Sequence, residues 1–278
     1  SAKVVTRIGN DDFGREIVRR FGEMGIDDDA VQVDEQAPTG MASVQLEKAG
    51  VPRFIIRDNA AWDYLVFTEA AQQAAQVADA VCFGSLAQRG KSTASVIQQL
   101  VAVTPAAALK VFDVNLRQEF YTREVIEKSL CLANVLKLND HELTVLAKMF
   151  DLSGAMNRQM ERLAGWFGLR LVALTRGDKG SFLYQAGNWS ELPGAAVQIV
   201  DTIGAGDSFT AALVMGLLGG MNLGDIHQAA ADIADFVCSN PGATPVLPER
   251  LRAKFGFQNT KAKSIATESA SVKTGMTA

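Results

Sequence analysis

The sequence predicts an α/β protein built on a mainly parallel central sheet. Short apolar runs rich in Val, Leu and Ile alternate with segments whose apolar residues recur at helical spacing; the runs lie at 80–83, 109–114, 135–138 and 171–174. Strands that are apolar throughout are typical of parallel sheets with helices on both faces. In such sheets, ligands bind at the carboxyl ends of the strands. At 278 residues, the chain could form one large domain or two small ones.

The other elements follow in order along the chain. A β-rich run at 4–8 is followed by a turn at 9–12 and a helix at 13–21. Alternating runs at 41–46 and 53–57, with a turn at 47–50 between them, predict a β-hairpin with one polar face. Further helices are predicted at 70–77, 92–101, 126–132, 142–149 and 160–167. A strand at 196–200 and helices at 209–218 and 231–238 complete the predicted elements.

Composition and charge exclude several classes of function. A net charge of -4 gives no electrostatic footprint for nucleic acid or an anionic membrane. The apolar runs are too short to span a bilayer, and residues 1–7 lack the apolar core of a signal peptide. Cys82, Cys131 and Cys238 are predicted to be buried free thiols of a reducing compartment, and two histidines are too few for a histidine-based metal centre. The cytoplasm is therefore the expected location.

The segment Asp201-Thr202-Ile203-Gly204-Ala205-Gly206-Asp207 has the features of an anion-binding turn. Its two glycines allow backbone conformations that bring an anion close to N–H groups, and the helix that follows offers free first-turn amides. Asp207, at the start of that helix, could cap it or accept a proton from a bound hydroxyl. An ordinary capped helix after a glycine turn is the alternative for so short a pattern.

Polar segments follow three of the predicted strands. They are Asp113-Val114-Asn115-Leu116-Arg117, Lys137-Leu138-Asn139-Asp140-His141-Glu142 and Thr175-Arg176-Gly177-Asp178-Lys179-Gly180. Because parallel strands end at one edge of the sheet, these segments are expected to lie together. Taken singly, Asn139 could be a turn residue, Glu142 a capping residue and Arg117 a surface ion-pair partner.

The string D-T-I-G-A-G-D followed by S-F-T-A-A resembles the C-terminal signature of the ribokinase-like (PfkB) carbohydrate kinases. The resemblance implies a ribokinase-like fold and transfer of the γ-phosphate of ATP to a sugar hydroxyl. It assigns the role of base to Asp207 and an anion hole to Gly204, Ala205 and Gly206.

The strand-end segments resemble further motifs of the same family. The resemblance implies ATP and Mg²⁺ as cofactors, with Mg²⁺ held by Glu142 through water, and ATP contacts from Asn139, Thr175, Gly177, Asn240 and Gly242. It implies substrate contacts from Arg57, Arg117 and Asp207. A potassium ion beside Asp201 and Ile203 is a further implied ligand.

The resemblance also divides the chain into parts. Residues 1–36 and 64–256 would form the α/β core, 37–63 a β-lid hairpin that covers the sugar and contributes to a homodimer, and 257–278 a polar tail. A plain surface hairpin is the alternative to the lid. Because V-V-T-R-I-G-N-D-D-F-G-R-E-I matches the family's second strand and helix, its first strand and glycine-rich sugar loop are expected before Ser1.

The segments N-L-R, T-R-G and F-G-S-L-A-Q, the last of them after Cys82, most resemble the fructokinase branch of the family. This resemblance favours fructose as the substrate, with 2-keto-3-deoxygluconate and ribose as alternatives. A chain that natively starts at Ser1 could instead be a non-catalytic nucleotide-binding relative. Gly84 to Ser92 looks like a phosphate-binding loop of the P-loop NTPases. One residue too many lies between its glycines, so an ordinary β-α turn is favoured over that class.

Overall fold

The computed structural model describes residues 1–46 and 52–256. The chain divides into two compact units, Ser1–Glu191 and Leu192–Ala278. The predicted turn at 47–50 and the predicted tail at 257–278 lie outside the described residues.

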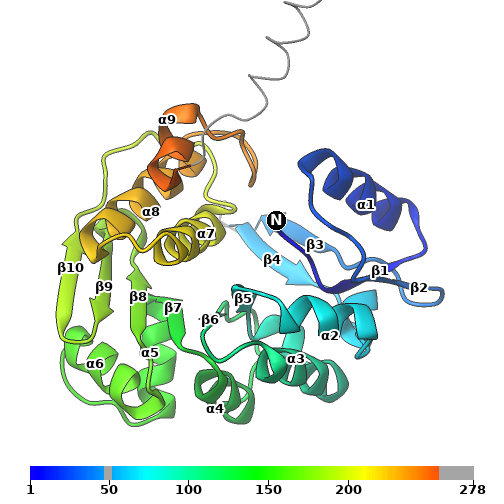
Figure 1. Ribbon diagram of the computed structural model, residues 1–278, viewed down its shortest axis with the longest axis horizontal. Coiled ribbons are helices and arrows are strands. Elements are labelled where there is room, and N and C mark those ends of the chain that lie inside the picture. The colour runs from blue at the N-terminus through cyan, green and yellow to red at the C-terminus, as the bar shows by residue number, and fades with distance from the viewer. Residues whose placement is uncertain (47–51, 257–278) are drawn as a thin grey trace, which may run out of the picture. The chain divides into compact units, whose positions relative to one another are not determined.

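A six-stranded sheet forms the centre of the first unit, in the order β10-β9-β8-β7-β6-β5 (Figure 1). Its strands are β5 (Ala80–Phe83), β6 (Leu109–Asp113), β7 (Val135–Asn139), β8 (Leu171–Thr175), β9 (Ser181–Gln185) and β10 (Asn188–Leu192). Strands β5 to β8 are parallel, and β9 pairs with β8 in the antiparallel direction. The predicted mainly parallel sheet is confirmed.

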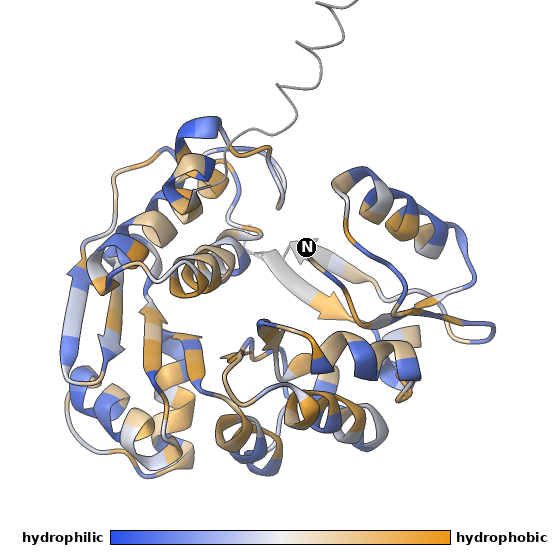
Figure 2. Cartoon of the chain, viewed as in Figure 1, coloured by the Kyte–Doolittle hydropathy of each residue, from blue (hydrophilic) through white to orange (hydrophobic). Residues whose placement is uncertain are grey.

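The register of the parallel strands sets the positions of the polar groups that end them. Asn139 pairs with Thr175 at the ends of β7 and β8, and Asp113 pairs with Lys137 at the end of β6. The first four residues of both β7 and β8 are buried, which explains why these strands are almost wholly apolar (Figure 2). Polar groups therefore begin where the buried stretch ends.

Helices α3 (Lys91–Val103), α4 (Arg123–Leu132), α5 (Asp140–Met149) and α6 (Met156–Phe167) line the sheet (Figure 1). The main hydrophobic core lies between these helices and the strands and includes Phe112, Leu138, Leu146 and Leu163, all 0% exposed. Side-chain caps fix where several helices begin. Thr122 caps α4 by accepting from the amide of Val125 at 3.2 Å.

A smaller two-stranded parallel sheet, β1 (Thr6–Gly9) with β2 (Val31–Asp34), flanks helix α1 (Asp12–Met24). The Asp11 carboxylate caps α1 through the Gly14 amide at 2.8 Å and also accepts from the Thr39 hydroxyl at 2.7 Å. These bonds lower the pKa of Asp11, the Thr39 hydroxyl having the largest effect. One carboxylate thus joins the start of α1 to the chain that enters the hairpin.

The hairpin strands are β3 (Ala42–Leu46) and β4 (Pro52–Ile56), which pair in the antiparallel direction. The chain then passes through the 3-10 turn η1 (Ala61–Tyr64) and helix α2 (Glu69–Gln76) before β5. A second 3-10 turn, η2 (Leu86–Gln88), lies between β5 and α3, and a third, η3 (Gly177–Lys179), lies between β8 and β9.

The second unit is helical. Helix α7 (Ala205–Leu218) packs along α8 (Leu223–Cys238), and α9 (Glu249–Arg252) and the turn η4 (Ala253–Phe255) follow. The helices approach closely at Gly216, where a Cβ would lie 2.8 Å from Ile226. Close backbone approach needs a small residue, which explains the glycine within α7.

Three predictions from the sequence need correction. Residues 196–200 form no strand, although they alternate in polarity; this segment is irregular, and the amides of Val200 and Asp201 both donate to the carbonyl of Cys238. Strands β2, β9 and β10 were not predicted. Cys82 and Cys131 are exposed rather than buried, because β5 ends the sheet and Cys131 lies on the outer surface of α4.

None of the helices in residues 1–46 and 52–256 is both long enough and apolar enough to cross a membrane.

His227 predicts a pH dependence of stability. It is 0% exposed on α8, and burial lowers its pKa from 6.5 to about 4. Between these two pKa values the unfolded chain binds a proton at His227 that the folded chain does not bind. The contribution of His227 to the free energy of unfolding is therefore greatest above pH 6.5 and falls as the pH drops towards 4. The expected slope approaches about 1.4 kcal/mol per pH unit within that window.

Urea unfolding at a series of pH values measures this slope. His227→Gln should flatten the curve between pH 6.5 and 4, whereas the matched variant at the exposed His141, His141→Gln, should leave it unchanged. Parallel curves for wild type and His227→Gln would contradict the prediction.

Candidate active site

The Glu142 carboxylate connects two strand ends. Its Oε2 accepts a hydrogen bond from the backbone N–H of Asn139 at 2.8 Å. Its Oε1 accepts one from the backbone N–H of Leu116, in the loop after β6, at 3.0 Å. The Asn139 side chain in turn accepts from the Glu142 amide at 2.8 Å, which completes a capping box on α5. Glu142 is 2% exposed, and burial raises its pKa against the lowering effect of these bonds.

A buried ion pair lies beside this network. The Lys137 ammonium is 3.1 Å from the Asp113 carboxylate, and their side chains are only 5% and 9% exposed. The negative charge of Asp113 contributes to the raised pKa of Glu142, and the positive charge of Lys137 opposes it. Two carboxylates and an ammonium group thus gather where β6 and β7 end.

The loop after β8 makes a tight turn. Thr175 is half-buried beside Asn139, and Gly177 has a φ of 57°, in the region that favours glycine. The guanidinium of Arg176 stacks on Phe182, 4.4 Å from the ring centroid, and donates to the Lys179 carbonyl at 2.7 Å. The turn is therefore held by its own side chain, and the backbone at Gly177 is exposed.

The two predicted substrate-binding arginines are both exposed. Arg117 folds back on its own loop, donating to the Leu116 carbonyl at 3.0 Å and to the Asn115 side chain at 3.2 Å. The same loop is held in an unusual conformation, because Asn115 and Gln118 have φ values of 46° and 49°. Arg57 follows β4 at the end of the hairpin.

In the second unit, the glycine turn has the conformation that its sequence predicts. Gly204 is the N-cap of α7 with a φ of 82°, and a Cβ there would lie 2.4 Å from the carbonyl oxygen of Ala243. Only glycine fits both the conformation and the close approach. The amides of Ala205, Gly206 and Asp207 belong to the first helical turn, where they have no acceptor within the helix.

Asp201 joins the glycine turn to the turn after α8. One of its carboxylate oxygens accepts from the Ile203 amide at 2.9 Å, and the other accepts from the Gly242 amide at 3.2 Å. Asn240 closes the end of α8 by donating its side-chain N–H to the Phe236 carbonyl at 2.7 Å. Gly242 itself has a φ of 81°.

Asp207 is exposed in the first turn of α7, on the same turn as these amides. The helix dipole favours an anion at this end, so the site suits both a carboxylate and a phosphate. An exposed carboxylate and amides that suit an anion therefore share one helix terminus.

The predicted site residues form two groups. Asn139, Glu142 and Thr175 meet at the strand ends of the first unit, and Arg117 follows Leu116 in a loop bonded to Glu142. The second unit brings together Asp201, Ile203, Gly204 and Gly242 around its two turns. Arg57 belongs to neither group.

Sequence reasoning missed the role of Lys137. Its signal was available, since Lys137 is a single charged residue inside the apolar strand 135–138. Residues 84–92 do not form the open loop with which a P-loop NTPase binds phosphate. Leu86–Gln88 form η2 instead, and the Gln88 side chain donates to the Gly84 carbonyl at 2.9 Å.

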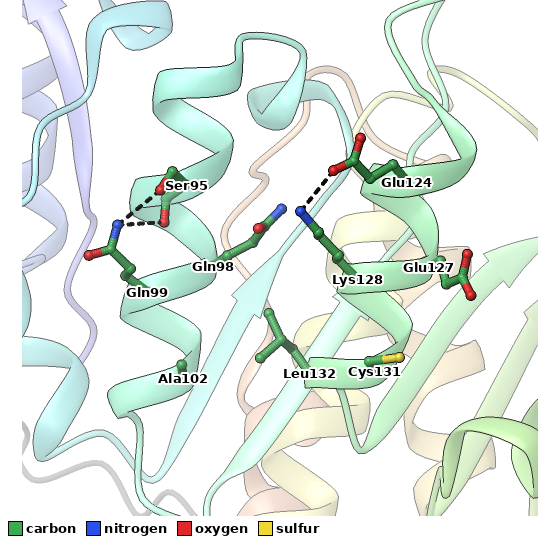
Figure 3. Close-up of a pocket in the computed structure, with 9 residues that line it drawn as sticks. All are labelled: Ser95, Gln98, Gln99, Ala102, Glu124, Glu127, Lys128, Cys131 and Leu132. Atoms are coloured by element: carbon green, nitrogen blue, oxygen red, sulfur yellow. Dashed lines mark hydrogen bonds and ion pairs between the residues drawn. The ribbon is translucent and has the colours of Figure 1, made fainter.

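Other features lie away from these groups. A groove of about 630 Å³ runs between the outer surfaces of α3 and α4, with side chains such as Gln98, Lys128 and Cys131 along it (Figure 3). Among the described residues, Asp27, Asp28 and Asp29 are the acidic cluster close enough to share a cation, and Lys3 forms ion pairs with the first and last of them.

Comparison with known proteins identifies related chains. The model of the pfkB family of carbohydrate kinases matches residues 1–250. A sugar kinase of Pyrococcus horikoshii, described as uncharacterized, is 28% identical over 264 residues, covering 91% of this chain and 80% of the relative. Fructokinase-2 of Oryza sativa subsp. japonica is 27% identical over 264 residues, covering 89% and 77% respectively.

Solved structures of related proteins have a similar fold. The Pyrococcus horikoshii sugar kinase in complex with ATP superposes with a TM-score of 0.74 at 26% identity, covering 91% of this chain and 84% of the other. An Escherichia coli protein provisionally named ribokinase II, solved with ATP and Mg²⁺, has a TM-score of 0.77 at 19% identity and coverages of 91% and 82%. The predicted ribokinase-like fold is confirmed.

Gly204 and Gly242, two left-handed glycines of the second unit, are expected to differ in the stability lost on substitution. Gly242→Ala would place a Cβ in open space, so it should lose about 1–2 kcal/mol of stability from backbone strain alone. Gly204→Ala should lose more, because its Cβ also meets the backbone of Ala243. Chemical unfolding of both variants measures the difference, and equal losses would show that the contact with Ala243 is unimportant.

Proposed function

Because the chain belongs to the pfkB family of carbohydrate kinases and so phosphorylates a sugar hydroxyl with ATP, we propose that Asp207 is the catalytic base and that the glycine turn binds the transferred phosphoryl group. The observation that carries this proposal is the shared helix terminus, where an exposed carboxylate stands among first-turn amides. No other described carboxylate among the predicted site residues combines exposure with a place on such a turn.

The proposed reaction is direct transfer. The Asp207 carboxylate accepts the proton of the sugar hydroxyl, and the hydroxyl oxygen attacks the γ-phosphorus. The bond between that phosphorus and the oxygen bridging to the β-phosphate breaks, which releases ADP. In this proposal the amides of Gly204, Ala205 and Gly206 stabilise charge on the transferring group, and losing one such donor costs about 3 kcal/mol of barrier by analogy with oxyanion holes.

ATP is proposed to bind through five residues. Asn139, Thr175 and Gly177 would contact the phosphates, while Asn240 and Gly242 would border the adenine. The tight turn at Gly177 supports this proposal, because Gly177 is exposed two residues after Thr175 and carries no side chain that would keep a phosphate away. Relatives solved with ATP support ATP as the ligand.

The carboxylates at the strand ends fit an outer-shell role towards Mg²⁺. Both oxygens of Glu142 already accept a backbone N–H, so its remaining lone pairs suit contact with metal-bound water rather than direct coordination. Mg²⁺, when bound, would neutralise charge on the phosphates. A potassium ion held by backbone carbonyls around Asp201 and Ile203 is part of the same proposal.

Fructose is the proposed sugar, with Arg57 and Arg117 as its contacts. The fructokinases among the relatives support this choice. The exposed guanidinium of Arg117 has only neutral partners in its own loop, so it can turn towards a substrate without breaking an ion pair. A homodimer formed through the β3–β4 hairpin is proposed as the assembly.

Asp207→Asn tests the base. Turnover should fall by about 10²–10⁴-fold, since the amide cannot accept the proton, while ATP affinity stays close to wild type. Asp225→Asn is the matched control, because Asp225 is an exposed acid in the first turn of α8. A coupled ADP-release assay with calorimetric ATP titration gives both values, and near-normal turnover by folded Asp207→Asn would refute the assignment.

A sugar panel tests the substrate. With the full-length protein and ATP, fructose should give the highest kcat/KM among fructose, 2-keto-3-deoxygluconate, ribose and glucose. A preference for another of these sugars would overturn fructose and leave the family assignment in place.

A further inference from the structure

The root of the hairpin, defined here as residues 38–40 and 57–63, is closed by direct contacts between its two arms. The Ala61 amide donates to the Pro38 carbonyl at 2.8 Å. Gly40 lies against Trp62 so closely that a Cβ would be 2.2 Å from the indole nitrogen. The entering and leaving chains are therefore fixed to each other at the base of β3 and β4.

Arg89, in the turn after η2, binds this root through its guanidinium group. Its side chain is 7% exposed, and its Nε and Nη2 donate to the two oxygens of Asp63 at 2.7 and 2.5 Å. Nη2 also donates to the Arg57 carbonyl at 2.7 Å, and Nη1 lies 3.7 Å from the Asp58 carboxylate. One guanidinium thus contacts both ends of the chain segment that leaves the hairpin.

The same guanidinium stacks between two aromatic rings. Its carbon lies 4.0 Å from the centroid of Trp62 and 4.7 Å from that of Phe120. Trp62 belongs to the hairpin root, whereas Phe120 belongs to the loop after β6, where its amide donates to the Arg117 carbonyl at 3.1 Å. Arg89 therefore joins the segment that carries Arg57 to the turn that carries Arg117.

We propose that Arg89 is a positioning residue for sugar binding, which fixes the hairpin root against the loop after β6 so that Arg57 and Arg117 face one substrate in a set geometry. The inference rests on the proposed roles of these two arginines. Arginine is specifically required, because its planar fork bonds both oxygens of Asp63 in parallel while it stacks on two rings, and an ammonium group lacks this planar geometry.

The test compares Arg89→Lys and Arg89→Met with wild type. In both variants the KM for the sugar should rise by at least about tenfold, whereas the KM for ATP and kcat at saturating sugar should stay within about twofold. Arg123→Lys is the matched control, since Arg123 also stacks on a ring, 5.0 Å from Phe150, away from the hairpin. It should leave all three constants unchanged.

Two further measurements separate positioning from general stability. Hydrogen exchange at 38–46 and 53–63 should become faster in Arg89→Lys, while exchange in β7 and β8 stays unchanged. Added ethylguanidinium should restore the sugar KM of Arg89→Ala. An unchanged sugar KM in Arg89→Lys, or a parallel rise of both KM values, would overturn the proposal.

The outcome for wild type separates this proposal from the proposed function. If wild type phosphorylates no sugar, the proposed function fails, and hydrogen exchange alone decides whether Arg89 holds the root. Exchange at 38–46 and 53–63 that is equal in wild type and Arg89→Lys would then overturn the inference.

Discussion

The hydrogen bonds accepted by the Glu142 carboxylate determine the geometry of the strand ends. One side chain ties the loop after β6, the end of β7 and the first turn of α5 together. Because the carboxylate is buried, each backbone N–H that it accepts also compensates for removing its charge from water. Every residue proposed to contact the phosphates in the first unit lies next to this group or one strand away.

Buried charges are the second recurring feature of the first unit. Lys137 with Asp113 and Arg89 with Asp63 are both largely removed from solvent, and such pairs cost desolvation that their attraction repays only when the geometry is good. Lys137 and Asp113 belong to the neighbouring strands β7 and β6, whereas Arg89 and Asp63 belong to turns beside the hairpin root.

The sequence predicts well what depends on local pattern. The strands β6 to β8 were predicted because their burial makes them largely apolar, and β5 was predicted because it is apolar although it is only partly buried. The spacing of Asn139 and Glu142 indicates both a capping box and a family motif. The prediction of a strand at 196–200 was wrong, because alternating polarity also occurs in this irregular segment, at whose end Val200 and Asp201 form backbone bonds to Cys238. The exposed cysteines were missed because neighbouring apolar residues do not reveal which strand ends a sheet.

Contacts between residues that lie far apart in the sequence could not be predicted from local sequence patterns. The surroundings of Arg89 come from the hairpin root and from the loop after β6, and nothing in the run 84–92 indicates either. Its lysine and glycines instead suggested a phosphate-binding loop. The arrangement of Asp201 with Gly242 likewise depends on how α7 and α8 pack, which no local pattern encodes.

The glycine turn obtains its shape from residues far along the chain. Gly204 is left-handed against the backbone of Ala243, and Asp201 bonds to Gly242. A synthetic peptide of residues 200–218 would hold every amide and the carboxylate of the turn, yet it would lack the surface that forces their arrangement. Such a peptide would have to order its own backbone before it could bind an anion, at about 1–2 kcal/mol per residue. Its weak binding would measure this missing support rather than the quality of the motif.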